Sequence, residues 1–163
     1  MKLVIQRVKN ACVTADGEET GRIGLGFLVL VGVMEGDTED LCGYLAEKTA
    51  NLRVFTDDQD KLNRSLKDVG GAVLAVSNFT LGGDCRKGHR PSFIQAAKQP
   101  LAEELYELYV QRLREQGIPV ETGRFGAHME IGMTASGPIT LIMDTDQMRK
   151  KSCLLYTSDA ADD

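Results

Sequence analysis

Four residues that follow an apolar stretch, Ser77-Asn78-Phe79-Thr80, have the types that bind a carbonyl oxygen. Hydroxyls, an amide and free backbone N–H groups at a strand end can form an oxyanion-type donor cluster. Taken alone, the pattern is more typical of a strand that finishes with turn-forming residues. The donor chemistry still makes this segment the first candidate site.

Three further features could contribute to a site. Gly137-Pro138, within Ala135–Thr140, usually marks a turn, and a cis bond there is a minority outcome that sequence cannot select. The loop Cys85–Phe93 is basic with an aromatic end, which suits phosphates and a stacked base as well as it suits plain solvation. Arg7, on an otherwise apolar strand, either faces solvent or anchors carbonyl oxygens.

The signatures of most enzyme classes are missing. The two histidines, His89 and His128, leave little for a Ser-His-Asp triad, and there is no Gly-x-Ser-x-Gly, phosphate-binding or dinucleotide-binding glycine motif. The four cysteines are scattered without a Cys-x-x-Cys pair, so neither a zinc site nor disulfides are expected. We therefore predict no metal and no cofactor.

The charge balance limits the choice of partners. The net charge is −5, of which the terminal residues Asp159, Asp162 and Asp163 supply three, so the body is close to neutral. A broad electrostatic grip on nucleic acid is not expected, and any RNA contact should be local; DNA is not an expected partner. No apolar run is long enough for a membrane helix, and MKLVIQRVKN lacks a signal core, so we expect a cytoplasmic protein.

Alternation and periodicity predict about eight strands and two main helices. The first helix should begin at an Asp37 N-cap, and the second at Pro100 with a stripe of leucines before Gly117. Thr56–Ser65 and Thr80–Ser92 should be loops. The expected strands are 2–9, Ala11–Ala15 and Glu19–Ile23 as a hairpin, Gly24–Met34, Arg53–Phe55, Ala72–Phe79, Ala127–Thr134 and Ile139–Asp144.

This mixed order predicts an α+β (mixed α/β) fold. We expect a single domain over residues 1–148, with a curled, partly barrel-like sheet and the two helices packed on it. Residues 149–163 lack periodicity and core-forming positions. They are similar to translated adapter DNA, so we expect a disordered, non-native tail without function.

Five motifs, in order and in register from Met1 to about Asp144, resemble the D-aminoacyl-tRNA deacylase family. They are Ile5-Gln6-Arg7-Val8, the Ser-x-Phe-Thr-Leu strand end, Arg90-Pro91-Ser92-Phe93, Thr122–Ala127 and the late Gly-Pro-x-Thr. The resemblance implies an editing hydrolase that cleaves D-amino acids, or glycine, from the 3′ end of tRNA. It also implies that the RNA's own 2′-hydroxyl helps to activate water.

The resemblance also implies roles for individual residues. Ser77, Asn78, Phe79 and Thr80 would line the ester pocket as the catalytic residues, with Phe79 and Thr80 presenting donors to the ester carbonyl. In a homodimer, Gly137 and Pro138, joined by a cis bond and braced by Arg7, would enter the partner's pocket and reject L-amino acids. The remaining implied contacts are with tRNA: Phe125 and Met129 for the terminal adenosine, and Arg86, Lys87, His89 and Arg90 for the acceptor stem.

The sequence departs from the family pattern at two places, and two alternative functions remain open. Asn78 stands where the family usually has glutamine, and Ala135-Ser136 where it often has Asn-Asp. One rival function is a small-molecule esterase that depends on Thr80 or Ser77. The other is an RNA-binding module that uses the Arg86–Arg90 loop without turnover.

Overall fold

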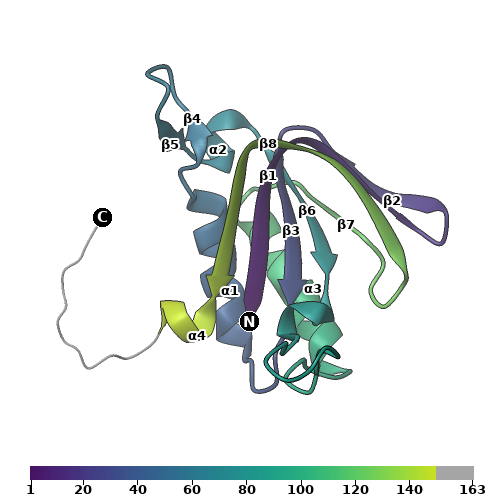
Figure 1. The fold of residues 1–163 in the computed structure, drawn as a ribbon. Coiled ribbons are helices and arrows are strands. Elements are labelled where there is room, and N and C mark those ends of the chain that lie inside the picture. The colour runs from purple at the N-terminus through teal and green to yellow at the C-terminus, as the bar shows by residue number, and fades with distance from the viewer. Residues whose placement is uncertain (150–163) are drawn as a thin grey trace.

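A computed structural model describes residues 1–149 as one curled sheet with helices on one face (Figure 1). The sheet runs in the order β2-β1-β3-β6-β7, and β8 pairs with the other edge of β1. A separate two-stranded sheet is formed by β4 and β5. The strands are β1 (Lys2–Ala15), β2 (Glu18–Ile23), β3 (Gly26–Gly32), β4 (Phe55–Thr56), β5 (Leu62–Arg64), β6 (Ala72–Ser77), β7 (Val120–Thr122) and β8 (Met129–Asp144).

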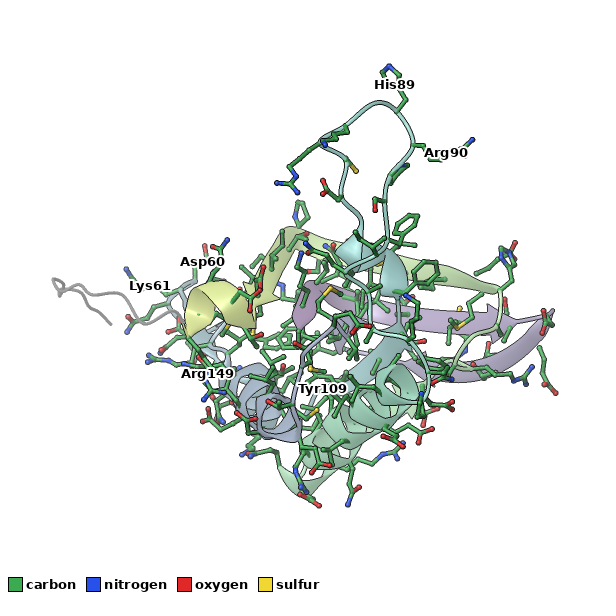
Figure 2. The ribbon with its side chains drawn as sticks, turned by 90° about the horizontal axis from the view of Figure 1, so that it is seen from below. Asp60, Lys61, His89, Arg90, Tyr109 and Arg149 are labelled. Carbon is green, nitrogen blue, oxygen red and sulfur yellow. The ribbon has the colours of Figure 1, made fainter. Side chains whose placement is uncertain are left out.

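Two long helices, α1 (Glu39–Asn51) and α3 (Leu101–Glu115), pack on the same face of the sheet. The short elements are α2 (Leu66–Val69), α4 (Thr145–Met148) and the 3-10 helix η1 (Phe79–Gly82). In Figure 2, Tyr109 lies between α1 and α3, and its hydroxyl is 2.9 Å from Thr49 Oγ1 in the buried interior. The predicted mixed fold with a partly barrel-like sheet is confirmed.

The curl of the sheet comes from β1, which takes part in two cores. Leu3 and Ile5 face the helices, whereas Val8, Ala11 and Val13 face a second core inside the curl. The change of face occurs at a bulge between Val8 and Asn10, which inserts one extra residue opposite β8. The first half of β1 pairs with β3 and the second half with β2, so the sheet bends around this bulge.

The curl nearly closes where β2 approaches β7. A Cβ atom on Gly21 would lie 2.8 Å from the Thr122 carbonyl oxygen, so this approach requires glycine. The strand β7 was not predicted, because a run of three residues carries too little periodicity to detect.

Several predicted boundaries are wrong. Residues 2–15 form one strand, and β8 continues through Gly137-Pro138, where a turn was predicted. The predicted loop Thr56–Ser65 contains β5, and Phe79 begins η1 instead of ending a strand. The N-cap of α1 is Thr38; Asp37 instead accepts hydrogen bonds from the Met1 ammonium and the Met34 N–H, at 2.9 and 2.7 Å.

The end of the described chain packs on α1. Arg149, the first residue of the predicted tail, forms an ion pair with Asp40 at 2.8 Å and lies over the Tyr44 ring. The remaining residues of that tail, 150–163, lie outside the described residues. Within residues 1–149, no helix has the length and apolar character needed to span a membrane.

Candidate active site

A cavity of about 380 Å³ opens where β3 and β6 end. It lies between the η1 turn, one side of α3 and the segment that leads into β8, and its lining is mainly apolar. Six predicted site residues meet there: Ser77, Asn78, Phe79, Thr80, Phe125 and Met129. The other lining residues are Val31, Val33, Ala97, Ala102, Tyr106, Gly126, Ala127 and His128.

The polar corner of the cavity is organised by Asn78. Its side-chain oxygen caps η1 by accepting the Thr80 backbone N–H at 3.1 Å, and it also accepts the Thr80 hydroxyl. The Phe79 N–H has no hydrogen-bond partner among residues 1–149. The strand end therefore leaves the Phe79 N–H available to a ligand, while both Thr80 donors are engaged internally.

The aromatic wall of the cavity is built by α3 and the segment before β8. The Tyr106 ring packs against Phe125 with centroids 5.9 Å apart, and its hydroxyl donates to the buried Ala75 carbonyl at 2.8 Å. Burial raises the pKa of Tyr106, so this hydroxyl stays protonated. Tyr106 was missed from the sequence, although its helical spacing with Tyr109, Val110 and Leu113 was a detectable signal.

The predicted basic loop forms an arm beside the cavity. Asp84 and Ser92 exchange two backbone hydrogen bonds at its base, and Figure 2 shows His89 and Arg90 far from the body of the protein. Arg86 binds the Asp84 carboxylate through both Nε and Nη2, at 2.9 and 2.7 Å. These bonds, with the Arg86 backbone N–H, lower the pKa of Asp84 to about 2. Arg86 therefore fastens the arm, whereas Lys87, His89 and Arg90 lie towards its tip and do not line the cavity.

The segment of residues 136–139, called the Gly137-Pro138 corner below, lies at the other end of the sheet from the cavity. Gln6 pairs with Thr140 and Val8 pairs with Ala135, so residues 136–139 bulge opposite Arg7 alone. The Gly137–Pro138 bond is cis. The Arg7 guanidinium donates to the carbonyls of Ser136 and Val54 at 3.2 and 2.8 Å. The predicted contact between Arg7 and this loop is therefore present.

This corner cannot reach the cavity of its own chain. Arg7 pairs with Phe27, which pairs with Val73, whereas Ser77 lies at the far end of β6. The offset is roughly 13 Å along the strands and about 14 Å across three strand spacings. Arg7, Gly137 and Pro138 are thus separated from the other predicted site residues.

Among residues 1–149, no hydrogen bond joins a nucleophilic side chain of the site to a histidine or carboxylate base. His128 lines the cavity, but no hydrogen bond joins its side chain to Ser77 or Thr80 among the described residues. The same residues include no cluster of three potential metal ligands. The fold and cavity thus define a class of small α+β protein with an apolar cavity at a strand end, where a backbone donor and the shape of the lining can act on a ligand.

Comparisons with known proteins identify the family. The D-Tyr-tRNA(Tyr) deacylase family matches residues 4–144. A D-aminoacyl-tRNA deacylase from Thermus aquaticus is 58% identical over 147 residues, which cover 90% of this chain and 97% of that protein. Another, from Halalkalibacterium halodurans, is 52% identical over 145 residues, which cover 89% and 99%. The chain belongs to the D-Tyr-tRNA(Tyr) deacylase family, which confirms the predicted family and makes it an ester hydrolase.

Solved structures share the fold. One titled "c-Myc DNA Unwinding Element Binding Protein" is 37% identical, with a TM-score of 0.83 over 88% of this chain and 98% of that one. Another, titled "Structural Analysis of a probable eukaryotic D-amino acid tRNA deacylase", has a TM-score of 0.73 over 87% and 97%. At 17% identity, the second comparison shows the fold alone.

Proposed function

We propose that this protein hydrolyses the ester that joins a D-amino acid, or glycine, to the 3′ end of tRNA, and that it rejects L-amino acids. The observation that carries the proposal is the polar corner at Ser77–Thr80 inside an apolar cavity, in a chain of this family. The Phe79 N–H, which has no hydrogen-bond partner among residues 1–149, would donate to the ester carbonyl. Such a donor stabilises the oxyanion that forms when water attacks.

Catalysis in this proposal relies on positioning and on the 2′-hydroxyl of the RNA. An aminoacyl ester is already activated, so a few fixed hydrogen bonds are sufficient. The Thr80 hydroxyl donates to the Asn78 amide oxygen, which is too weak a base to activate it as a nucleophile. This contact argues against the rival esterase that depends on Thr80. It also gives Asn78, which is shorter than the glutamine usual in the family, the role of fixing the η1 turn.

Chiral selection in this proposal requires a homodimer. The Gly137-Pro138 corner of one subunit would enter the cavity of the other, where its carbonyls hold the α-amino group and leave no space for an L side chain. Two features support the dimer. The corner is too far from its own cavity, and the outer face carries Ile142, which is 74% exposed, beside the half-buried Val4 and Leu30. An apolar stripe of this kind is typical of an interface.

The tRNA would reach the cavity with its 3′-terminal adenosine against Phe125 and Met129. The arm would lie along the acceptor stem, where Lys87, His89 and Arg90 can meet phosphates. The acidic overall charge favours this local contact over general binding of DNA or RNA, so we expect no DNA partner and no binding module without turnover. The proposed place of action is the cytoplasm.

Incubation with D-Tyr-tRNA and L-Tyr-tRNA tests the proposed activity. The D-ester should be hydrolysed at least about 100-fold faster than the L-ester, because a steric clash excludes far more strongly than the loss of one methylene contact. Glycyl-tRNA should also be hydrolysed. Release of labelled amino acid gives both rates. Equal rates for the two tyrosyl esters, or a stable D-ester, would contradict the proposal.

Replacing Thr80 with alanine separates the proposal from the rival esterase. The Phe79 N–H and the RNA hydroxyl remain in the Thr80→Ala variant, so we expect a residual rate within about 100-fold of the wild type. A Thr80 nucleophile requires complete loss. Thr80→Ser, which keeps the hydroxyl, is the matched control. Single-turnover hydrolysis of D-Tyr-tRNA measures both variants, and no detectable turnover in Thr80→Ala with near-normal turnover in Thr80→Ser would support the rival.

A further inference from the structure

Gly123, which follows β7, packs against the side chain of Met129. A Cβ atom on Gly123 would lie 2.5 Å from the Met129 sulfur and 3.7 Å from Val13 Cγ2. Non-bonded atoms in a packed interior do not approach to 2.5 Å, so any side chain at position 123 would displace Met129. The Gly123 backbone is not in the left-handed region, so the obstacle is this one side chain.

The half-buried Met129 side chain borders the cavity, which gives it space in which to move. On its inner side it packs against the core inside the curl, where Val13 is fully buried, and Gly123 occupies a second side. The cavity that ends at Ser77–Thr80 lies on another side of Met129. A methionine has three rotatable side-chain bonds and adapts readily, so a methyl group at position 123 would move its thioether into this cavity.

We propose that Gly123 is a positioning residue that sets the width of the cavity by keeping Met129 withdrawn. Gly123 does not line the cavity; it acts through Met129, which does. This inference rests on the proposed function, in which the aminoacylated terminal nucleoside fills the cavity. A Met129 side chain displaced into the cavity would narrow the space beside Phe125. Substrate binding would therefore weaken, whereas the ester chemistry at Phe79 would change little.

The test uses Gly123→Ala, Met129→Ala and the double variant. Gly123→Ala should raise KM for D-Tyr-tRNA about tenfold while kcat changes less than about twofold, because binding is lost uniformly before the chemical step. The double variant should return to the KM of Met129→Ala, since the clash disappears with the methionine side chain. The control is Gly132→Ala on β8, whose added Cβ would make an ordinary 3.4 Å contact with Cys12. An unchanged KM in Gly123→Ala, or additive effects in the double variant, would overturn the proposal.

A second measurement does not depend on activity. With ¹³C-methyl methionine, Gly123→Ala should shift the Met129 methyl resonance and leave that of the distant Met1 unchanged. Thermal melting, together with an unchanged Met1 resonance, shows whether the variant is folded. A wild-type protein that fails to hydrolyse D-Tyr-tRNA would overturn the proposed function, whereas an unmoved Met129 resonance in the folded variant would overturn only this inference.

Discussion

A Pro138→Ala variant is expected to lose most of its preference for D-tyrosyl-tRNA. We expect the D/L ratio of kcat/KM to fall at least about 100-fold, through faster L-ester hydrolysis, slower D-ester hydrolysis or both. The reason is that residues 136–139 have no register partners on β1, and in the proposed dimer the Gly137 and Pro138 carbonyls would contact the substrate. Removing the ring changes where those carbonyls point. Rates with both esters, measured in parallel, give the ratio.

The control for Pro138→Ala is Pro119→Ala. Pro119 is exposed, and its backbone carbonyl, which accepts the Val73 N–H, is retained after the substitution. This variant should keep the wild-type D/L ratio. If Pro138→Ala keeps full rate and full chirality, then the corner has no part in selection.

Mixing subunits tests whether the corner acts across a dimer. Pro138→Ala keeps an intact cavity, whereas Phe79→Pro removes the N–H donor but keeps the corner. A random 1:1 mixture, refolded together, should recover about a quarter of the wild-type D-selective turnover beyond that of the two variants measured alone, because half of the dimers would contain one intact site of two. If each corner served its own chain, no dimer in the mixture would contain an intact site, and the mixture would show no D-selective turnover beyond that of the two variants alone.

One part of the cavity, the segment Ser77–Thr80, could be predicted because its position depends on local sequence alone. The segment Ser77–Thr80 comes directly after an apolar strand, so its position at a strand end follows from the pattern alone. The availability of the Phe79 N–H was not predictable in the same way. It depends on the Asn78 side chain, whose oxygen accepts the Thr80 N–H and not the Phe79 N–H.

The misread elements depend on contacts between residues far apart in sequence. Asp37 is a residue type that favours N-caps, but its carboxylate instead accepts a hydrogen bond from the Met1 ammonium at 2.9 Å. Gly137-Pro138 has the composition of a turn, but the backbone continues as β8. Arg7, 129 residues earlier, binds the Ser136 carbonyl that the bulge leaves unpaired. Local periodicity contains no information about either partner.

Replacing Arg7 with alanine is expected to disable the corner without touching the cavity. The Arg7 guanidinium donates to both Ser136 O and Val54 O. Both contacts are partly buried, so each carbonyl that loses its donor should cost no more than about 1 kcal/mol. The bulge would lose its support against the chain before β4. We therefore expect the D/L ratio to fall at least about tenfold in Arg7→Ala, together with a lower melting temperature.

The Arg7→Lys variant shows whether Arg7 acts through its two hydrogen bonds to carbonyl oxygens or through its positive charge alone. A lysine ammonium is a point donor without the planar fork of arginine, so it should not hold both carbonyls and should give an intermediate D/L ratio. Arg22→Ala, which removes an exposed pair with Glu19, is the control for loss of an arginine from the same sheet and should leave the ratio unchanged. If Arg7→Ala melts at a lower temperature but keeps the wild-type D/L ratio, then Arg7 stabilises the fold only, and the position of the corner must be fixed by other contacts.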